Sequence, residues 1–560
     1  MQVSVSNNIR IRGAPVPLRA MITKALTVDN PQYKDRKNKR LPTWGISQKL
    51  QLYIQQGTDL ILPRGFLTAL EEMLRTVFPG GGYEYVLLTG EGMEADFGEW
   101  TGPQLWAEQA EALHDVLAGG NGILVAPAGS GKTNMGMGYV KVKHRAALWL
   151  THTKDLLYQS AERARQVLGA VGDVGIIGDG KVHWGSGKLI VATVQTLQER
   201  PDLVKALDDV IGTVVIDEAH HFPAPAFIEV AGKFKAKNML GITATPDRKD
   251  RLEVYMYTGI GPKLHSIDRQ KLYDTGRLVM PRVEFIYTSF AFEQASDRNE
   301  LNNVDAGGED LDYIALTRAL IADPPRAELI ARNIIKAANQ FGYSIVITES
   351  VRYCYVLQQA VKDLLAKENL YIGPMEVIHG PISRYTWRAA KTEKNALAMV
   401  TQGKAKNYRH HKTLGWQVEV EQYTEAEFLS WQISNSQRKE ILARAARKEI
   451  HVLFATQLAR EGLDMPHLTV GHLAMPKRGD ASDSKNGASV EQEIGRIMRY
   501  DPQHPDKKAV WYDYVDYNVG VYQSQYQSRR SVYKRLGITL PIKPKTRRDE
   551  IEEFLSSMPY

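Results

Sequence analysis

The segment APAGSGKT at residues 126–133 constrains the fold of this chain more than any other feature. It directly follows the apolar run GILV at residues 122–125 and precedes a segment expected to be helical. Glycines in such a loop let backbone N–H groups surround phosphate oxygens, while Lys132 can reach the β and γ phosphates of a nucleotide and the Thr133 hydroxyl can bind Mg²⁺. The usual first glycine is replaced by Ala126, so an ordinary glycine-rich turn is the alternative. A phosphate-binding loop between a strand and a helix predicts a parallel α/β sheet.

Short apolar runs alternate with helical segments in two series along the chain. The first series comprises GILVAPA, AALWLTH, KLIVATV, TVVIDEA and MLGITAT, and the second, after GRLVMPRVEF, comprises SIVITES, MEVIHG, HVLFATQ and TVGHLAM. Strands that are apolar throughout are typical of parallel sheets buried on both faces. A chain of 560 residues is also too long for one hydrophobic core. We therefore predict an α/β fold with two consecutive parallel-sheet domains.

The segments around these two series predict a small N-terminal α+β module, a linker, an insertion and a tail. The N-terminal module has a strand pair around Asn7 and, at KDRKNKR (residues 34–40), an expected exposed loop. The predicted boundaries are 1–92 for this accessory, DNA-binding module, 93–272 for the first sheet domain, 273–283 for the linker, 284–535 for the second sheet domain and 536–560 for a basic tail. An insertion spanning residues 384–436 interrupts the second domain.

The composition restricts the compartment and the partners of the chain. The formal net charge of +7 and the pI near 9.0 fit a polyanionic partner. Cys354 is the single cysteine, which excludes an intrachain disulfide and a four-cysteine zinc site. The N-terminus MQVSVSNNIRIRG lacks the apolar core of a signal peptide, and no apolar run approaches the ~18 residues of a membrane span. We therefore expect a cytoplasmic protein without a membrane partner, and the sequence indicates no particular protein partner.

The stretch TVVIDEAHHF at residues 213–222 places two carboxylates after an apolar strand, 85 residues beyond Lys132 (217 − 132). Asp217 can hold Mg²⁺ through water, and Glu218 can polarise an attacking water molecule. A zinc site at His220 and His221 is disfavoured, because neighbouring histidines on a strand or turn are expected to point apart and no cysteine or third histidine stands at ligand spacing. With the phosphate-binding loop, the stretch predicts ATP hydrolysis.

Together these motifs resemble the superfamily 2 helicases of DEAH type, and the resemblance covers residues 105–535. It is carried by DEAH at 217–220, TAT at 243–245, ATQLAREGLDMP at 455–466 and QEIGRIMR at 492–499, in the family order. The resemblance implies two tandem RecA-like domains, ATP with Mg²⁺ as cofactors, and a nucleic acid as partner.

The resemblance also implies a role for each motif residue. The predicted nucleotide-binding residues are Gln109, Ala128, Gly129, Ser130, Gly131, Lys132, Thr133, Gly462 and Asp464, with Thr133 and Asp217 as Mg²⁺ ligands. The predicted catalytic residues are Asp217, Glu218, His220, Gln492, Arg496 and Arg499, and the residues that couple nucleotide state to domain movement are Thr243 and Thr245. For Gln109, an adenine-reading role competes with that of an ordinary exposed helical glutamine.

Hydroxyl and amide side chains at the ends of strands occupy the family's nucleic-acid-contact positions. They are Thr151, His152, Thr193, Gln195, Thr348, Ser350 and Thr456. Such groups suit phosphate oxygens but do not read bases. Capping of helices by Thr and Ser is the alternative for each of them.

Arg496 and Arg499 belong to the second sheet domain, so they can reach a γ-phosphate only when the two domains close. An arginine supplied in this way stabilises transition-state charge and is typically worth ~10³–10⁵ in rate. Hydrolysis then depends on closure, and closure can move a bound strand. The chain is therefore predicted to be a motor.

Several motifs separate branches of the family. DEAD-box RNA helicases would carry DEAD and usually SAT, and DEAH RNA-processing helicases carry a large region after the last motif, whereas 61 residues follow Arg499 here (560 − 499). The chain looks more like xeroderma-pigmentosum-B-type helicases and phage recombination helicases of the UvsW type. We expect an ATP-dependent DNA helicase or translocase acting on forked or branched DNA in recombination or repair, in a bacterial or phage-infected cell.

Three other functions are alternatives to a DNA motor. They are an RNA-remodelling ATPase with the same motor, a translocase subunit of a restriction-type complex, and a binding scaffold with a decayed motor. The presence of Lys132, Asp217, Glu218 and Arg499 argues against the scaffold.

The insertion begins with a basic segment, residues 384–412, in which the one acid is Glu393. Its basic residues are Arg384, Arg388, Lys391, Lys394, Lys404, Lys406, Arg409 and Lys412, interspersed with Trp387, Tyr408, His410 and His411. Residues 413–436 then carry four glutamates and no basic residue. This pattern predicts a nucleic-acid-contacting insertion in which Trp387 and Tyr408 can stack on bases and the acidic half packs back or shields it. The alternative is a solvated helical hairpin.

The C-terminal region is also basic. It lacks acids from Tyr517 to Arg548 and carries eight basic residues from Arg529 onwards. A disordered basic tail that contacts nucleic acid is the expectation for this composition.

Overall fold

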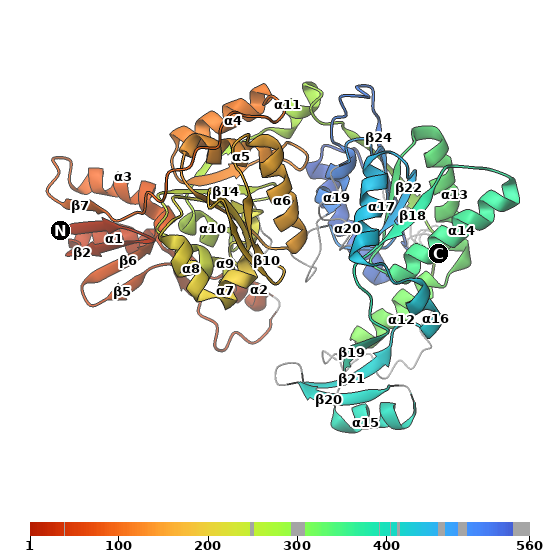
Figure 1. The fold of residues 1–560 in the computed structure, drawn as a ribbon. Coiled ribbons are helices and arrows are strands. Elements are labelled where there is room, and N and C mark those ends of the chain that lie inside the picture. Colours follow the sequence, from red (N-terminus) through yellow and green to blue (C-terminus); the bar gives the residue numbers. More distant parts are fainter. Residues whose placement is uncertain are drawn as a thin grey trace, which may run out of the picture. The chain divides into compact units, whose positions relative to one another are not determined.

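The computed structural model describes residues 1–38, 40–246, 251–292, 309–390, 392–403, 405–411, 415–456, 465–479 and 490–540 (Figure 1). The chain forms two compact units, Met1–Leu278 and Val279–Tyr560. Each unit holds one large sheet of mainly parallel strands. The predicted α/β class with two tandem parallel-sheet domains is confirmed.

The first unit begins with a five-stranded sheet in the order β5-β6-β2-β1-β7. Its strands are β1 (Gln2–Val5), β2 (Asn8–Arg12), β5 (Ile54–Gln56), β6 (Asp59–Pro63) and β7 (Glu84–Leu87), and the helices α1 (Val16–Ala25) and α3 (Leu67–Val77) complete its hydrophobic core. A second, two-stranded sheet joins β3 (Thr27–Asp29) to β4 (Lys49–Gln51). β1 and β2 pair antiparallel around Asn7, as the sequence predicted.

The expected exposed loop at residues 34–40 was wrong over most of its length, because Pro31–Asn38 form the helix α2. The Asn30 side chain accepts a hydrogen bond from the Gln32 N–H, and Pro31 suits the first helical position. Asn30 and Pro31 therefore start the helix. None of its residues is buried, so its composition resembles that of a loop.

Arg64, in the short helix η1 (Arg64–Phe66), fixes this module to the larger sheet of the same unit. Its buried guanidinium donates to the carbonyl oxygens of Ala236 and Lys237, the second at 2.7 Å. Gly65 lies so close to the backbone of residues 257–261 that a side chain there would collide with it.

The larger sheet of the first unit has the strand order β11-β10-β12-β9-β13-β14-β8-β15. Its strands are β8 (Gly122–Val125), β9 (Ala147–Thr151), β10 (Val174–Gly178), β11 (Lys181–Gly185), β12 (Leu189–Thr193), β13 (Thr213–Asp217), β14 (Asn238–Thr243) and β15 (Lys263–Ser266). β11 alone among these pairs antiparallel. The five runs named above form β8, β9, β12, β13 and β14, which are almost entirely buried, as expected for strands covered on both faces.

Helices cover both faces of this sheet (Figure 1). One face packs against α7 (Val194–Glu199), α8 (Pro201–Asp208), α9 (Pro225–Ala231) and α10 (Glu253–Gly259). The helices α4 (Ala107–Ala118), α5 (Lys132–Lys143) and α6 (Lys154–Val167) follow the alternating pattern, and α11 (Arg269–Asp274) ends the unit. The parallel strands therefore bring the loops after β8, β13 and β14 to one edge of the sheet.

The second unit contains a six-stranded parallel sheet in the order β16-β24-β23-β17-β22-β18. Its strands are β16 (Pro281–Tyr287), β17 (Ser344–Ile347), β18 (Met375–Ile378), β22 (Val452–Ala455), β23 (Val470–Leu473) and β24 (Ala509–Val515). Its helices are α12 (Glu309–Ile321), α13 (Pro324–Phe341), α14 (Val351–Glu368), α17 (Asn435–Ala446), α19 (Val490–Ile497) and α20 (Gly520–Arg535).

α20 corrects the expectation for the C-terminal region. Arg529 is buried and forms a two-pronged ion pair with Asp513, at 2.8 and 2.9 Å. It is therefore part of the core of the second unit, and residues 541–560 lie outside the described residues.

The insertion forms a three-stranded antiparallel sheet in the order β19-β21-β20, with the helix α15 (Glu393–Thr401) on it (Figure 1). Its strands are β19 (Tyr385–Ala389), β20 (Asn407–His411) and β21 (Gly415–Glu421), and α16 (Glu425–Ser430) follows. The helical-hairpin alternative was wrong. The acidic half supplies the central strand and lies between the two basic strands.

Among the described residues, no helix is both long and apolar enough to cross a membrane.

Candidate active site

The loop between β8 and α5 has the backbone of a phosphate-binding loop. Gly129 and Gly131 have φ of 84° and 79°, in the left-handed region that favours glycine. A Cβ at residue 131 would in addition collide with the side-chain amide of Gln109. The Ala126 N–H donates to the Thr243 carbonyl oxygen at 2.9 Å, so the loop is tied to the end of β14. The N-terminus of α5 directly follows this loop, which suits a bound phosphate.

Gln109 is bound to this loop and is 4% exposed, which excludes the alternative of an ordinary exposed glutamine. Its side-chain NH₂ donates to the Ser130 carbonyl oxygen at 2.8 Å, and its side-chain oxygen accepts from the Trp106 N–H at 3.0 Å. The Ser130 hydroxyl is buried and has no hydrogen-bond partner among the described residues. Adenine recognition by Gln109 stays a prediction.

Four predicted residues from three segments meet beside the loop. The ammonium of Lys132 lies 3.4 Å from one carboxylate oxygen of Glu218, and the other oxygen lies 3.3 Å from Nδ1 of His220. The same His220 nitrogen lies 3.1 Å from the hydroxyl of Thr243, which accepts from the Thr245 N–H at 3.2 Å. The phosphate-loop lysine, the DEAH segment and TAT therefore form one polar cluster.

The two acidic residues of this cluster differ in charge behaviour. Burial, together with the neighbouring Glu218, raises the pKa of Asp217 above its usual range. Burial also opposes ionisation of Glu218, but the charges of Lys132 and the contact with His220 outweigh it and hold the pKa of Glu218 below its usual range. These shifts favour the ionised form of Glu218 and the protonated form of Asp217.

The donor set fits the predicted magnesium ion. Mg²⁺ prefers hard oxygen ligands and binds through one or two carboxylates together with substrate phosphates. Asp217 supplies such a carboxylate at the end of β13, and Thr133 supplies a hydroxyl in the first turn of α5. The residues needed for this ion are present at the expected ends of the elements.

The two neighbouring histidines do not follow the expectation from the sequence that their rings point apart. His220 and His221 do not point apart, because the short helix η2 (Ala219–His221) brings their ring centroids to 4.2 Å. The His221 ring also lies 4.1 Å from that of His152, and burial lowers the pKa of His152 to about 4. The rings are tilted by 37° and 38° against one another, and no group of three or more His, Cys, Asp or Glu side chains that could hold a metal ion occurs in the described part of the chain.

The predicted nucleic-acid contacts are mostly turned into the protein. Thr151, Thr193, Thr348 and Thr456 are at most 7% exposed, and Ser350 caps α14 by accepting from the Tyr353 N–H. Gln195 is exposed, and its NH₂ donates to the His152 carbonyl oxygen at 3.0 Å. The capping alternative therefore describes Ser350, and contact with a strand stays a prediction for all seven residues.

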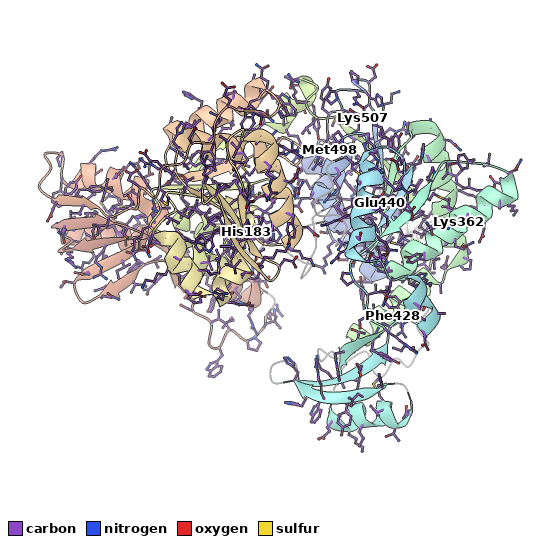
Figure 2. All side chains as sticks on the ribbon, viewed as in Figure 1. His183, Lys362, Phe428, Glu440, Met498 and Lys507 are labelled. Carbon is purple, nitrogen blue, oxygen red and sulfur yellow. The ribbon has the colours of Figure 1, made fainter. Side chains whose placement is uncertain are left out.

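In the second unit, α19 carries Gln492 and Arg496, and Arg499 follows it. Lys477 and Glu493, both buried, form an ion pair at 3.0 Å that fixes one side of this helix. The Lys507 ammonium donates to the carbonyl oxygens of Arg499 at 2.8 Å and Pro466 at 2.5 Å, and thereby joins the last residues of two predicted motifs. Lys507 is labelled in Figure 2. Gly462 and Asp464 lie outside the described residues.

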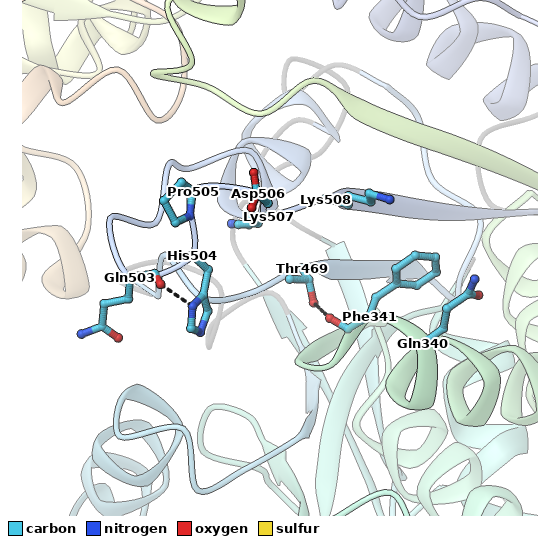
Figure 3. Close-up of a pocket in the computed structure, with 9 residues that line it drawn as sticks. All are labelled: Gln340, Phe341, Thr469, Gln503, His504, Pro505, Asp506, Lys507 and Lys508. Atoms are coloured by element: carbon cyan, nitrogen blue, oxygen red, sulfur yellow. Dashed lines mark hydrogen bonds between the residues drawn. The ribbon is translucent and has the colours of Figure 1, made fainter.

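Lys477 and Lys507 were missed by the sequence reasoning. Lysine is rarely buried, so nothing in the local sequence distinguishes them from surface lysines. Burial lowers the pKa of Lys507 to about 7. Lys507 also lines a surface hollow with Gln340, Phe341, Thr469, Gln503, His504, Pro505, Asp506 and Lys508 (Figure 3), none of which was predicted as a site residue.

Two family models match the chain. The model described as "Type III restriction enzyme, res subunit" matches residues 103–248, and the helicase conserved C-terminal domain matches residues 389–501. The matched segments contain the phosphate loop with DEAH and the arginine helix, respectively. Over these two segments the chain is similar to superfamily 2 helicases.

Curated relatives of this chain are named as acting on DNA or on RNA. The DNA 3'-5' translocase XPB2 of Sulfurisphaera tokodaii is 31% identical over 188 residues, which are 33% of this chain and 40% of that protein. A putative ATP-dependent RNA helicase of Acanthamoeba polyphaga mimivirus is 23% identical over 89% of this chain and 79% of its own length. The chain spans 29–56% of the length of three XPB-type and Rad25-type relatives.

Solved structures agree on the fold. The Type ISP restriction-modification enzyme LlaBIII, solved bound to DNA, matches 81% of this chain and 32% of its own chain, at 13% identity and a TM-score of 0.50. At this identity the likeness supports the shared fold alone.

Proposed function

We propose that this chain is a DNA helicase or translocase that couples ATP hydrolysis, with Mg²⁺, to unwinding or branch migration of forked or branched DNA in the cytoplasm. The observation that carries the proposal is the contact of Lys132 with Glu218, and of Glu218 with His220, at the ends of β8 and β13. It puts a phosphate-binding cation, a charged base and the TAT segment in one buried cluster.

The hydrolysis step follows from these contacts. The N–H groups of the loop and Lys132 hold the β and γ phosphates, and Glu218 takes the proton of the attacking water. Mg²⁺, held by Thr133 and Asp217, would neutralise charge on the phosphate oxygens. A change of charge on Glu218 is felt by His220, which also contacts Thr243. This contact gives the TAT segment a direct physical link to the state of the nucleotide.

The second unit supplies the arginines of the proposal. We assign transition-state stabilisation to Arg499, with Arg496 able to share the role, as the family resemblance implies. The Lys477–Glu493 pair and Lys507 hold the helix and the turn that carry them.

DNA is the favoured substrate because the XPB-type relatives are named as DNA translocases and helicases. An RNA-remodelling ATPase is the second candidate, since the mimiviral relative named as an RNA helicase matches most of this chain. The restriction-type alternative rests on the first family model and on LlaBIII, both of which share the motor fold. The DEAH-type and phage assignments stay predictions.

The test compares the rate of ATP hydrolysis with single-stranded DNA, forked DNA, a four-way junction and RNA as activators. We expect the forked or branched DNA to activate most strongly and strand displacement to require hydrolysable ATP. Activation by RNA alone would establish the second candidate.

A further inference from the structure

The small sheet of the insertion has two unlike faces. Alternate residues of a strand point to opposite faces, and the pairing aligns Val418 with Arg388 and Tyr408. Val418 and Val420 pack with Ala396 of α15 in a small hydrophobic cluster that Tyr408 joins. α15 therefore covers the face that carries Val418 and Tyr408.

The opposite face carries Tyr385 and Trp387 on β19, and Arg409 on β20. The guanidinium carbon of Arg409 lies 4.0 Å from the centre of the Trp387 ring, and its Nε donates to the Gln417 side-chain oxygen at 3.0 Å. The Lys406 ammonium lies 4.3 Å from the centre of the Tyr385 ring. Both aromatics are half-exposed, and a cation lies over the ring of each.

This arrangement corrects the prediction that Trp387 and Tyr408 both stack on bases. Tyr408 is on the face under α15, where it contacts Trp416, and Trp416 also contacts His410. Tyr385 and Trp387 are instead the aromatic pair of the open face. They are two residues apart on one strand, which separates them by roughly 6.6 Å.

We propose that this open face binds single-stranded nucleic acid, with bases stacked on Trp387 and Tyr385 and phosphates beside Arg409 and Lys406. The proposal rests on the proposed function and names the surface that receives a separated strand. Aromatic side chains on an open sheet stack bases of single strands, and nearby cations bind the backbone.

The chemistry of the face selects this occupant over duplex. Bases in a duplex are stacked on one another and offer no free ring face to Trp387, whereas a single strand does. Glu419 lies on the central strand, between Trp387 and Asn407. Its carboxylate repels a phosphate over the middle of the sheet but can accept a hydrogen bond from an exposed base amine. The backbone of a bound strand is therefore expected along the cations, with its bases directed inward.

The insertion is anchored to the second unit at its base. Arg352 of α14 pairs with Glu427 of α16 at 2.6 Å, and the rings of Tyr355 and Trp431 stack at 4.5 Å. Arg384 pairs with Glu421 at 3.0 Å and Glu425 at 3.2 Å, and its guanidinium carbon lies 5.4 Å from the centre of the Tyr385 ring, so it links this joint to the open face. A strand held on the sheet would thus be held by the domain that carries α19.

The test is the affinity of the full chain for a short single-stranded oligothymidine, its RNA counterpart and a blunt duplex, measured by fluorescence anisotropy. Trp387→Ala is expected to weaken binding of the single strands about 5- to 100-fold, with little change for the duplex. Trp387→Phe should retain most of the affinity because it keeps a stacking ring. Arg409→Gln should flatten the dependence of affinity on salt, since each lost phosphate contact removes roughly 0.7 from that slope for single strands.

Tyr371, a tyrosine of the same unit that is 79% exposed and lies outside the insertion, gives the matched control Tyr371→Ala. Its binding should equal that of the wild type. Unchanged single-strand affinity in both Trp387→Ala and Arg409→Gln, in chains that melt like the wild type, would overturn the proposal, as would an equal loss for duplex.

Basal ATP hydrolysis on the same preparations separates the two claims. An active ATPase with unchanged oligonucleotide binding in the variants rejects the open face as the binding surface. Selective loss of single-strand binding without any ATPase in the wild type supports this surface and rejects the proposed motor.

Discussion

The two units hold their predicted site residues in different ways. In the first unit, Lys132, Glu218 and His220 contact one another directly in a buried cluster. In the second unit, Arg496 lies on α19, which the Lys477–Glu493 ion pair fixes. Arg499 lies on the following turn, where Lys507 donates a hydrogen bond to its carbonyl oxygen. The proposal makes the first arrangement a nucleotide-binding site within one unit and assigns to the arginines of the second a role in the rate of hydrolysis. Changes in the first should therefore affect nucleotide binding and hydrolysis, and changes in the second should affect rate.

The largest effect is expected from Lys132→Ala. It removes the cation placed for the β and γ phosphates and leaves Glu218 without its main stabilising charge. ATP binding and nucleic-acid-stimulated hydrolysis should both fall to background, measured by nucleotide titration and phosphate release. Lys141→Ala, at the end of the same helix, is the control and should behave like the wild type. Near-normal turnover in Lys132→Ala would refute the phosphate-loop assignment.

Glu218→Gln should separate binding from hydrolysis within the first unit. It removes the base but keeps Asp217 and the loop, so Mg²⁺-ATP should bind with nearly wild-type affinity while hydrolysis is lost. The same two assays decide the point. If ATP binding falls as far as in Lys132→Ala, the separate roles of the two residues are wrong.

Arg499→Ala should lower kcat by ~10³-fold or more and leave the affinity for ATP of the free protein nearly unchanged. Steady-state kinetics with a saturating DNA activator measure the first quantity and nucleotide titration the second. Arg332→Ala removes a surface arginine of the same unit that pairs with Glu328 and Glu368, and should change neither. An unchanged kcat with collapsed DNA binding would instead make Arg499 a phosphate-backbone contact.

The smallest effect is expected from a change at Lys507, whose ammonium donates a hydrogen bond to the Arg499 carbonyl oxygen. Lys507 has a folded pKa of about 7, against about 10.5 in an unfolded chain. The unfolded state therefore binds more protons between these values, so this residue makes stability rise as pH increases from 7 to 10.5. We therefore expect the difference in free energy of unfolding between the wild type and Lys507→Met to increase in favour of the wild type across that pH window. The increase should reach up to a few kcal/mol, since each pKa unit corresponds to ~1.4 kcal/mol. Urea titrations at several pH values measure it.

Lys508→Met, at the exposed neighbouring lysine, is the matched control and should show no such trend. Parallel pH curves for the wild type and Lys507→Met would mean that Lys507 is not buried as described.

The parts of the fold and site that could be predicted are those encoded in contiguous segments. Apolar runs predicted β8, β9, β13 and the other core strands, because a strand buried on both faces leaves a local signature. The chemistry of Lys132 and Glu218 followed from motif spacing. The contact of His220 with Thr243 joins residues of different strands, so only the strand order reveals it.

What could not be predicted depends on pairing register and on burial. Trp387 and Tyr408 look equivalent in the sequence, but the register of β19 and β20 against β21 puts them on opposite faces. Lys477 and Lys507 look like surface lysines until their buried partners are known. The residues of α2 are mostly charged and carry no apolar periodicity, so the sequence predicts a loop where the structure has a helix.

The most direct test of the account is the rate of Mg²⁺-dependent ATP hydrolysis by the full chain, measured with and without forked DNA. The buried cluster of Lys132, Glu218 and His220 predicts a measurable basal rate, and the proposed motor predicts that the DNA increases it several-fold. A chain that binds ATP and DNA but hydrolyses no ATP with any DNA or RNA would contradict the account at its centre.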